Sequence, residues 1–173
     1  MLQITFFIQI LIIALFSPHQ NINTQNFDYQ SIIKFSHYVY WPEENENNNF
    51  VIYIATNSEQ KFNDISSLLI NQNFNGKNII VNQYTDQSDI SNAQVIFIEK
   101  NSSVDLNTFK EKIDKKKILT LSNDENLLNY GCMFYVNQKE DYIDYLFKKQ
   151  TILDSGLLIR TSLLSNNHIY NNE

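Results

Sequence analysis

Few side chains of this 173-residue sequence are of the types that carry out nucleophilic or metal chemistry. Cys132 is the only cysteine, so no intramolecular disulfide can form, and it begins the apolar run 132–136. A reactive thiol needs a nearby base or a helix N-terminus to lower its pKa, so we expect Cys132 to be a small buried side chain. Apart from His19, the histidines are His37 and His168, which lack the spacing of metal ligands. The sequence predicts no catalytic residue, no metal site and no cofactor.

Phosphate recognition is also not indicated. The three glycines, Gly76, Gly131 and Gly156, are far apart and form no glycine-rich phosphate loop. The formal net charge is −6, whereas domains that bind nucleic acid are normally basic. Lys115–Lys117 ends a predicted helix, where cations complement the helix dipole. We therefore expect a protein that is not an enzyme and has no nucleic-acid partner.

Two carboxylates are candidates for ligand binding. Asp86 and Asp89 follow a predicted strand, near the edge of the sheet where ligands bind in open α/β folds. They could contact a small ligand there. An Asx turn or a helix cap is the simpler explanation, because it needs no ligand.

An aromatic group at the end of the first predicted helix is the candidate partner interface. The aromatic set there is Phe35, Tyr38, Tyr40 and Trp41, and the residues taken as the candidate interface are Phe35, Tyr38, Trp41 and Pro42. Not all of these side chains can point inward, and aromatic residues at such positions often anchor a protein partner. Alternatively, Trp41 and Pro42 cap the sheet edge and fix the turn, because proline forces the residue before it out of the helical conformation.

The first residues form a separate segment. Residues 1–16 carry no charged side chain, and their apolar stretch is shorter than the roughly 20 residues that cross a membrane. This pattern predicts a signal peptide over residues 1–20, with an uncleaved anchor as the alternative. We expect residues 21–26 to be a polar linker and residues 27–170 to form a single α/β domain.

The rest of the chain alternates between apolar runs typical of buried strands and amphipathic segments typical of helices. Helices are expected at 28–40, 58–72, 104–116, 124–130, 150–155 and 161–166. Strands are expected at 50–55, 78–84, 94–98, 117–122, 132–136 and 142–148, the last antiparallel to the one before it. This order predicts an α/β fold with a mostly parallel central sheet of about five to six strands and helices on both faces.

Taken in order, several motifs resemble the YfiR-like family of periplasmic domains. The resemblance extends over residues 27–169 and rests on Phe35-x-x-Tyr38-x-x-Trp41-Pro42, the runs 50–55 and 94–98, Ile118-Leu-Thr-Leu-Ser-Asn123, Tyr130-Gly-Cys-Met-Phe134 and Ser155-Gly-Leu-Leu-Ile-Arg-Thr-Ser-Leu-Leu164. One departure is Cys132, which stands where the family has the second glycine of a pair. A single cysteine also cannot reproduce the disulfides of the founding member.

The resemblance implies an exported, non-enzymatic regulatory domain located in the periplasm. Its partner would be a signalling protein of the inner membrane, either a diguanylate cyclase or a sensor histidine kinase, controlled by protein–protein contact. The resemblance also allows a homodimer. The alternative function is a periplasmic protein that binds a small ligand at the carboxyl edge of the sheet.

Overall fold

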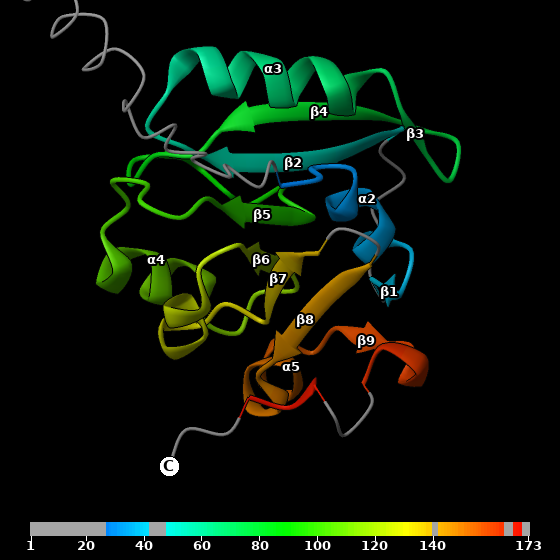
Figure 1. Cartoon of the computed structure of the whole chain (residues 1–173), viewed down its shortest axis with the longest axis vertical. Coiled ribbons are helices and arrows are strands. Elements are labelled where there is room, and N and C mark those ends of the chain that lie inside the picture. The colour runs from blue at the N-terminus through cyan, green and yellow to red at the C-terminus, as the bar shows by residue number, and fades with distance from the viewer. Residues whose placement is uncertain (1–26, 42–47, 140–141, 165–167, 171–173) are drawn as a thin grey trace, which may run out of the picture.

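A seven-stranded sheet forms the centre of the molecule, for which we obtained a computed structural model that describes residues 27–41, 48–139, 142–164 and 168–170 (Figure 1). The strand order is β3-β4-β2-β5-β6-β7-β8. Five neighbouring strands are parallel: β4 (Lys77–Gln83), β2 (Asn49–Ala55), β5 (Val95–Ile98), β6 (Leu119–Ser122) and β7 (Phe134–Gln138). The outer strands β3 (Asn73–Phe74) and β8 (Ile143–Phe147) are antiparallel to their neighbours. The predicted mostly parallel α/β sheet is confirmed.

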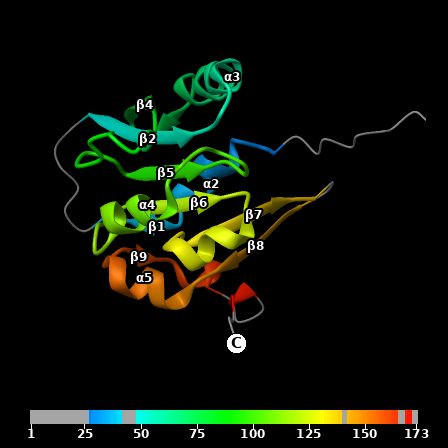
Figure 2. The same ribbon diagram turned by 90° about the vertical axis from the view of Figure 1, so that its left-hand side faces the viewer.

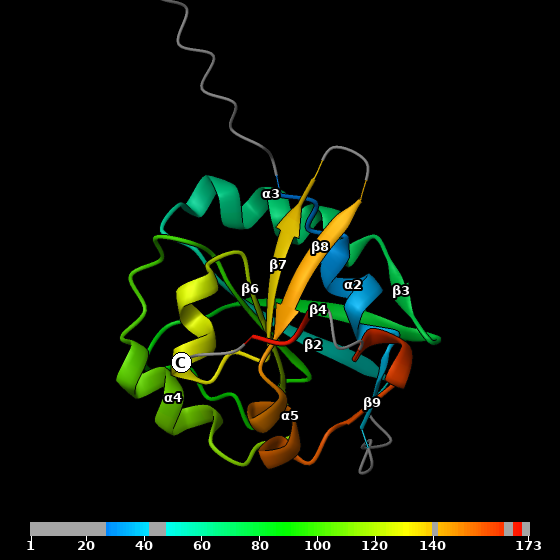
Figure 3. The ribbon, with the colours of Figure 1, turned by 60° about the horizontal axis from the view of Figure 1, so that its bottom comes forward.

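Helices cover both faces of this sheet, as predicted. They are α2 (Ser31–Ser36), α3 (Glu59–Ile70), α4 (Leu106–Ile113) and α5 (Lys149–Ser155), with the 3-10 helices η1 (Glu125–Tyr130) and η2 (Thr161–Leu163). Figure 3 shows α2 and α4 on opposite sides of the central strands. Alternate residues of β2 enter two separate cores: Ile52 and Ile54 pack with α2 and α3, whereas Val51 and Tyr53 pack with α4 and η1.

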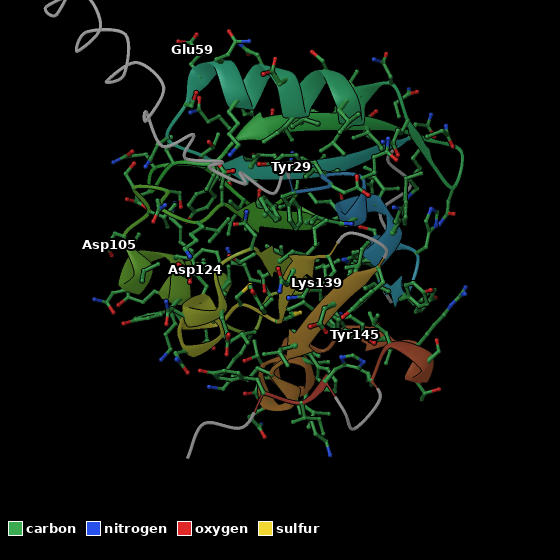
Figure 4. All side chains as sticks on the ribbon, in the orientation of Figure 1. Tyr29, Glu59, Asp105, Asp124, Lys139 and Tyr145 are labelled. Atoms are coloured by element: carbon green, nitrogen blue, oxygen red, sulfur yellow. The ribbon has the colours of Figure 1, made fainter. Side chains whose placement is uncertain are left out.

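The helices that follow strands start with local caps that the sequence encodes. The side chains of Ser58, Asp105 and Asp124 accept hydrogen bonds from the backbone N–H groups of Lys61, Thr108 and Asn126. Figure 4 shows Glu59, Asp105 and Asp124 on the side toward which the arrows of β2 and β5 point. The helix starts therefore lie along the carboxyl edge of the sheet.

Two glycines follow directly on helices that the sequence predicts at 124–130 and 150–155. Gly131 follows η1 with φ 92° and Gly156 follows α5 with φ 72°, conformations that side-chain-bearing residues rarely adopt. The predicted antiparallel pairing of the fifth and sixth strands is confirmed as the β7–β8 hairpin, which is seen from the side in Figure 2.

The predicted helix over residues 28–40 is wrong in length. Helix α2 covers only Ser31–Ser36, and the chain then forms β1 (Val39–Tyr40), antiparallel to β9 (Leu158–Ile159). The backbone N–H of Arg160 adds a 2.8 Å bond to the carbonyl of Tyr38. Valine and tyrosine are common in strands, and the backbone groups of Val39 and Tyr40 pair with those of β9, which is distant in the sequence. The short β3 was also not expected, and the helix predicted at 161–166 is a 3-10 turn at 161–163.

Cys132 is fully buried beside β7, where its Sγ lies 3.4 Å from the carbonyl oxygen of Phe134. Burial raises the pKa of this thiol from 9.0 to about 12. We expect Cys132→Ala to cost about 1 kcal/mol of unfolding free energy, as for other losses of a small buried group. Above pH 9 the thiol ionises in the unfolded chain but stays neutral in the folded one, which stabilises the unfolded state. The stability that Cys132 contributes is therefore complete below pH 9 and declines as the pH rises toward 12.

Thiol labelling checks this assignment. In the folded protein, Cys132 should react with a thiol reagent only as fast as local or global unfolding exposes it. In the urea-unfolded protein it should react at once. Fast labelling of the folded chain would contradict the burial of Cys132.

Candidate functional site

The strand order places a topological switch point at the carboxyl ends of β2 and β5. Strand β2 pairs with β4 on one side and with β5 on the other. The connection after β2 runs through α3 on one face of the sheet, and the connection after β5 runs through α4 on the other face. Where connections diverge in this way, open α/β sheets bind their ligands.

A buried carboxylate, Glu99, occupies this position directly after β5. Its side chain is 8 % exposed, and it accepts hydrogen bonds from the hydroxyls of Tyr29 (2.6 Å) and Thr56 (2.7 Å). Lys61, on the first turn of α3, forms an ion pair with the same carboxylate. The segment before α2 and the connection from β2 into α3 therefore both bind this carboxylate, and such partners are what normally stabilise a buried carboxylate.

The segment before α2 crosses this edge. The ring of Phe27 stacks on Phe97 with centroids 5.0 Å apart, and Tyr29 meets Phe97 edge-on at 5.7 Å. The pKa of Tyr29 is raised, mainly by burial and to a smaller extent by the hydrogen bond to Glu99. The hydroxyl therefore stays protonated and acts as a donor. Beside it lies an open groove of about 710 Å³, lined on its polar side by Lys61, Glu99 and Lys100.

The two predicted ligand-edge carboxylates lie in different surroundings. Asp86 lines a hollow of about 230 Å³ with Thr56 and Ser102, and its carboxylate faces the backbone N–H of Asp105 at 3.3 Å. Tyr84 lines the same hollow and is 4 % exposed, and its hydroxyl has no hydrogen-bond partner among the described residues. Burial, together with the charge of Asp86, raises the pKa of Tyr84 to about 12.

Asp89 makes local contacts instead. Its side chain accepts a 2.9 Å bond from the backbone N–H of Ser91, which is the Asx turn considered as the alternative above. Its carbonyl accepts the hydroxyl of Tyr53, from the middle of β2, at 2.7 Å. The bonds from Ser91, with smaller contributions from the charges of Lys116 and Lys112, lower the pKa of Asp89. The structure thus brings Asp86, but not Asp89, to the hollow.

Two members of the predicted aromatic interface are core residues. Phe35 is 4 % exposed and packs edge-on against Phe134 and Tyr145, each at 5.4 Å. Trp41 is 7 % exposed and meets Phe50 edge-on at 5.6 Å. Their burial favours the structural interpretation of these two side chains. Pro42 lies outside the described residues, as do the predicted signal peptide and linker.

Exposed apolar side chains nevertheless gather next to Trp41. Tyr38 is 38 % exposed, and Tyr40 of β1 and Leu158 of β9, which face each other across the two strands, are 61 % and 57 % exposed. We call Tyr38–Tyr40 with Leu158–Ile159 the β1–β9 ribbon. Single exposed apolar residues are common, but a cross-strand pair of this size at the tip of a short ribbon is a candidate contact surface.

A family model described as YfiR/HmsC-like matches residues 26–166 of the chain. The chain belongs to the YfiR/HmsC-like family. No curated protein matches it. Membership in the YfiR/HmsC-like family implies a periplasmic regulator of membrane signalling proteins, and the family is not known as enzymatic. In the described part of the chain, no helix is long and apolar enough to span a membrane.

The histidines of this YfiR/HmsC-like chain that the structure describes lie against aromatic rings. His37 lies over Phe74 with centroids 4.8 Å apart, and His168 stacks on Tyr145 at 4.2 Å. Within the described ranges, His, Cys, Asp and Glu side chains form no group of three or more that could hold a metal ion.

The Glu99 cluster of this YfiR/HmsC-like domain is not predicted from the sequence. One feature of the sequence points to Glu99. It directly follows the predicted strand 94–98, so it lies where a parallel strand reaches the edge of the sheet that binds ligands. Nothing in the sequence linked Tyr29 or Lys61 to it. Tyr29 lies 70 residues away and belongs to a segment that was predicted to be an ordinary helix.

Proposed function

We propose that this chain is exported and controls an inner-membrane signalling protein, a diguanylate cyclase or a sensor histidine kinase, by direct protein–protein contact without catalysing a reaction. The family match over residues 26–166 carries this proposal. To act as a regulator, the protein must bind one conformational state of its partner more tightly than another, because equal affinity for both states shifts nothing.

We further propose that the β1–β9 ribbon contacts the partner. Tyr38 and Tyr40 supply the exposed aromatic area that typically anchors a protein interface, and Leu158 extends it. Phe35 and Trp41 would then act indirectly, because their buried rings hold α2 and β1 on the sheet. Of the three candidate interface residues that the structure describes, Phe35, Tyr38 and Trp41, Tyr38 is the one whose exposure suits direct contact.

Replacing Tyr40 and Leu158 together by serine should weaken partner binding by about tenfold or more, since a hot-spot side chain contributes about 2 kcal/mol. The unfolding free energy should change by no more than about 0.5 kcal/mol, because the two side chains are largely exposed. Binding would be measured with the periplasmic regions of the diguanylate cyclases and sensor histidine kinases of the same cell.

Tyr142→Ser is the matched control, since Tyr142 is 62 % exposed but lies at the β7–β8 hairpin. The control should bind like the wild type. Equal weakening by the control, or full binding by the ribbon variant, would reject the ribbon as the contact.

The proposal includes cleavage of the first segment. We expect the mature protein to begin between Ser17 and Phe27, and N-terminal sequencing of the periplasmic fraction would measure this. Recovery of the uncleaved chain from the membrane fraction would instead support the anchor alternative.

A second candidate function, small-ligand binding at the carboxyl edge, is favoured by the hollow at Asp86. The buried Tyr84 hydroxyl has no partner among the described residues, and the Asp86 carboxylate beside it accepts hydrogen bonds. The hollow of about 230 Å³ is smaller than usual sites for drug-sized ligands. A small molecule with amino or hydroxyl groups would fit. Thermal-shift screening of such compounds, with Asp86→Asn as the negative control, tests this candidate.

A further inference from the structure

The first described residues of the chain lie across the carboxyl edge of the sheet, at the switch point where open α/β sheets bind their ligands. We call residues 27–30 the N-terminal strap. The ring of Phe27 stacks on Phe97 of β5 with centroids 5.0 Å apart, and Tyr29 meets Phe97 edge-on at 5.7 Å. The position that a ligand takes in open α/β sheets is therefore filled by the chain itself.

Side chains attach the strap to the sheet. Its backbone hydrogen bonds run to the start of α2, for example from the N–H of Ile32 to the carbonyl of Tyr29, and Asp28 pairs with Lys34 of the same helix at 2.8 Å. Among the described residues, no backbone hydrogen bond joins the strap to a strand. Phe27 and Tyr29 are also only half-buried. Lifting the strap from the edge therefore breaks side-chain contacts and leaves the strand pairing intact.

The polar anchor of the strap is the carboxylate of Glu99. It accepts the hydroxyl of Tyr29 at 2.6 Å and that of Thr56 at 2.7 Å, and Lys61, whose side chain is 47 % exposed, pairs with it. When the strap lifts, Glu99 loses one of these donors, and Phe97 loses the rings that cover it. The space left by the ring of Tyr29 then lies between a charged acceptor and an aromatic side chain.

We propose that this space is a binding site for a small phenolic compound, and that the N-terminal strap is its internal competitor. The ring of the compound packs against Phe97 where the ring of Tyr29 lies, and its hydroxyl donates to Glu99 in place of the Tyr29 hydroxyl. The open groove of about 710 Å³ beside the strap gives the compound a route to the site. The inference does not depend on control of a membrane partner.

The groups around this space select a phenol over other ligands. An ionised carboxylate only accepts hydrogen bonds, so it favours a ligand that donates one. An aromatic ligand without a hydroxyl leaves Glu99 with one donor fewer, and an anionic ligand is repelled by it. A cation also suits a carboxylate, but Lys61 already supplies an ammonium group. The hollow at Asp86 is a separate site, because neither Glu99 nor Tyr29 lines it.

The test uses the purified mature chain with p-cresol, which has the ring and hydroxyl of a tyrosine side chain, and with toluene, which lacks the hydroxyl. Calorimetric titration measures both affinities. Tyr29→Ala should bind p-cresol at least about tenfold more tightly than the wild type does, because the strap occupies the site in most wild-type molecules. Toluene should bind this variant at least about fivefold more weakly than p-cresol, because toluene cannot donate to Glu99.

Further variants keep the test informative if Tyr29→Ala is unstable. Phe27→Ala removes only the stacked ring, so it should loosen the strap and raise the affinity for p-cresol while Tyr29 and Glu99 remain. Glu99→Gln, added to Tyr29→Ala, keeps the shape of the site without its charge and should weaken p-cresol binding at least about threefold. Tyr142→Ala is the matched control, since it removes an exposed tyrosine from the β7–β8 hairpin, and it should bind p-cresol like the wild type.

Four results would overturn the proposal. Equal affinity of the wild type and Tyr29→Ala for p-cresol would show that the strap does not occupy the site, and a gain of affinity in Tyr142→Ala would show that the effect is not local. Equal affinity of Tyr29→Ala for p-cresol and toluene would show that Glu99 does not select a phenol. Absence of p-cresol binding by Tyr29→Ala and Phe27→Ala, with circular dichroism showing both folded, would mean that there is no site. The membrane partner is absent from these titrations, so their failure leaves the proposed function standing.

Discussion

Trp41→Ala is expected to lower the free energy of unfolding by about 3–5 kcal/mol, the usual cost of truncating a buried tryptophan. Trp41 is 7 % exposed, and its ring meets Phe50 and Phe74 edge-on with centroids 5.6 and 6.3 Å away. These two phenylalanines stack on each other at 4.0 Å, so the deletion opens a cavity beside an aromatic cluster. Urea unfolding followed by circular dichroism measures the loss.

Tyr40→Ala provides the comparison for Trp41, because it removes the adjacent but 61 % exposed aromatic ring. It should leave the unfolding free energy within about 0.5 kcal/mol of the wild-type value. An unchanged melting temperature for Trp41→Ala would contradict its role in the core. If that variant then also lost regulation, Trp41 would have to be a direct contact.

Glu99→Ala should cost about 3 kcal/mol of unfolding free energy. The substitution leaves the hydroxyls of Tyr29 and Thr56 without their acceptor, and hydrogen bonds to a charged group contribute about 1.5–3 kcal/mol. Lys61 adds little to this figure, because its side chain is 47 % exposed and can turn to water. Chemical denaturation of the purified mature chain measures the effect.

A double-mutant cycle shows whether Glu99 and Tyr29 act together. Tyr29→Phe and Glu99→Ala should show a coupling of about 0.5–3 kcal/mol, whereas Lys61→Met alone should cost less than about 1 kcal/mol. Strict additivity of Tyr29→Phe and Glu99→Ala would mean that the 2.6 Å hydrogen bond contributes nothing measurable. The segment at Tyr29 would then be held to the sheet only by the ring contacts with Phe97.

Local signals in the sequence predicted much of the fold correctly. Ser58 caps α3, Gly131 and Gly156 end helices, and the apolar runs became the buried parallel strands. Each of these features depends on residues within a few positions of one another. Helical periodicity failed at Val39–Tyr40, because the partner strand Leu158–Ile159 lies more than 100 residues away and no nearby residue indicates it.

The candidate sites were less predictable than the fold. The aromatic group was recognised as a set, but which rings are buried depends on Phe74 and Phe134, which belong to other elements of the chain. The sequence places Glu99 at the end of a strand, but nothing in it places Tyr29 beside that carboxylate. Such sites form only when distant segments meet, so composition and spacing do not reveal them.

The most direct test of the central claim is the signalling activity of the inner-membrane cyclase or kinase that binds this chain, reconstituted in vesicles with its periplasmic side outward and titrated with the mature chain. The account predicts that cyclase or kinase activity changes to a plateau as the protein binds. It also predicts that the serine variant of Tyr40 and Leu158 shifts this titration to about tenfold higher concentration, with Tyr142→Ser behaving as wild type. Saturating binding with unchanged activity would contradict the account, because the protein would then bind both states of its partner equally.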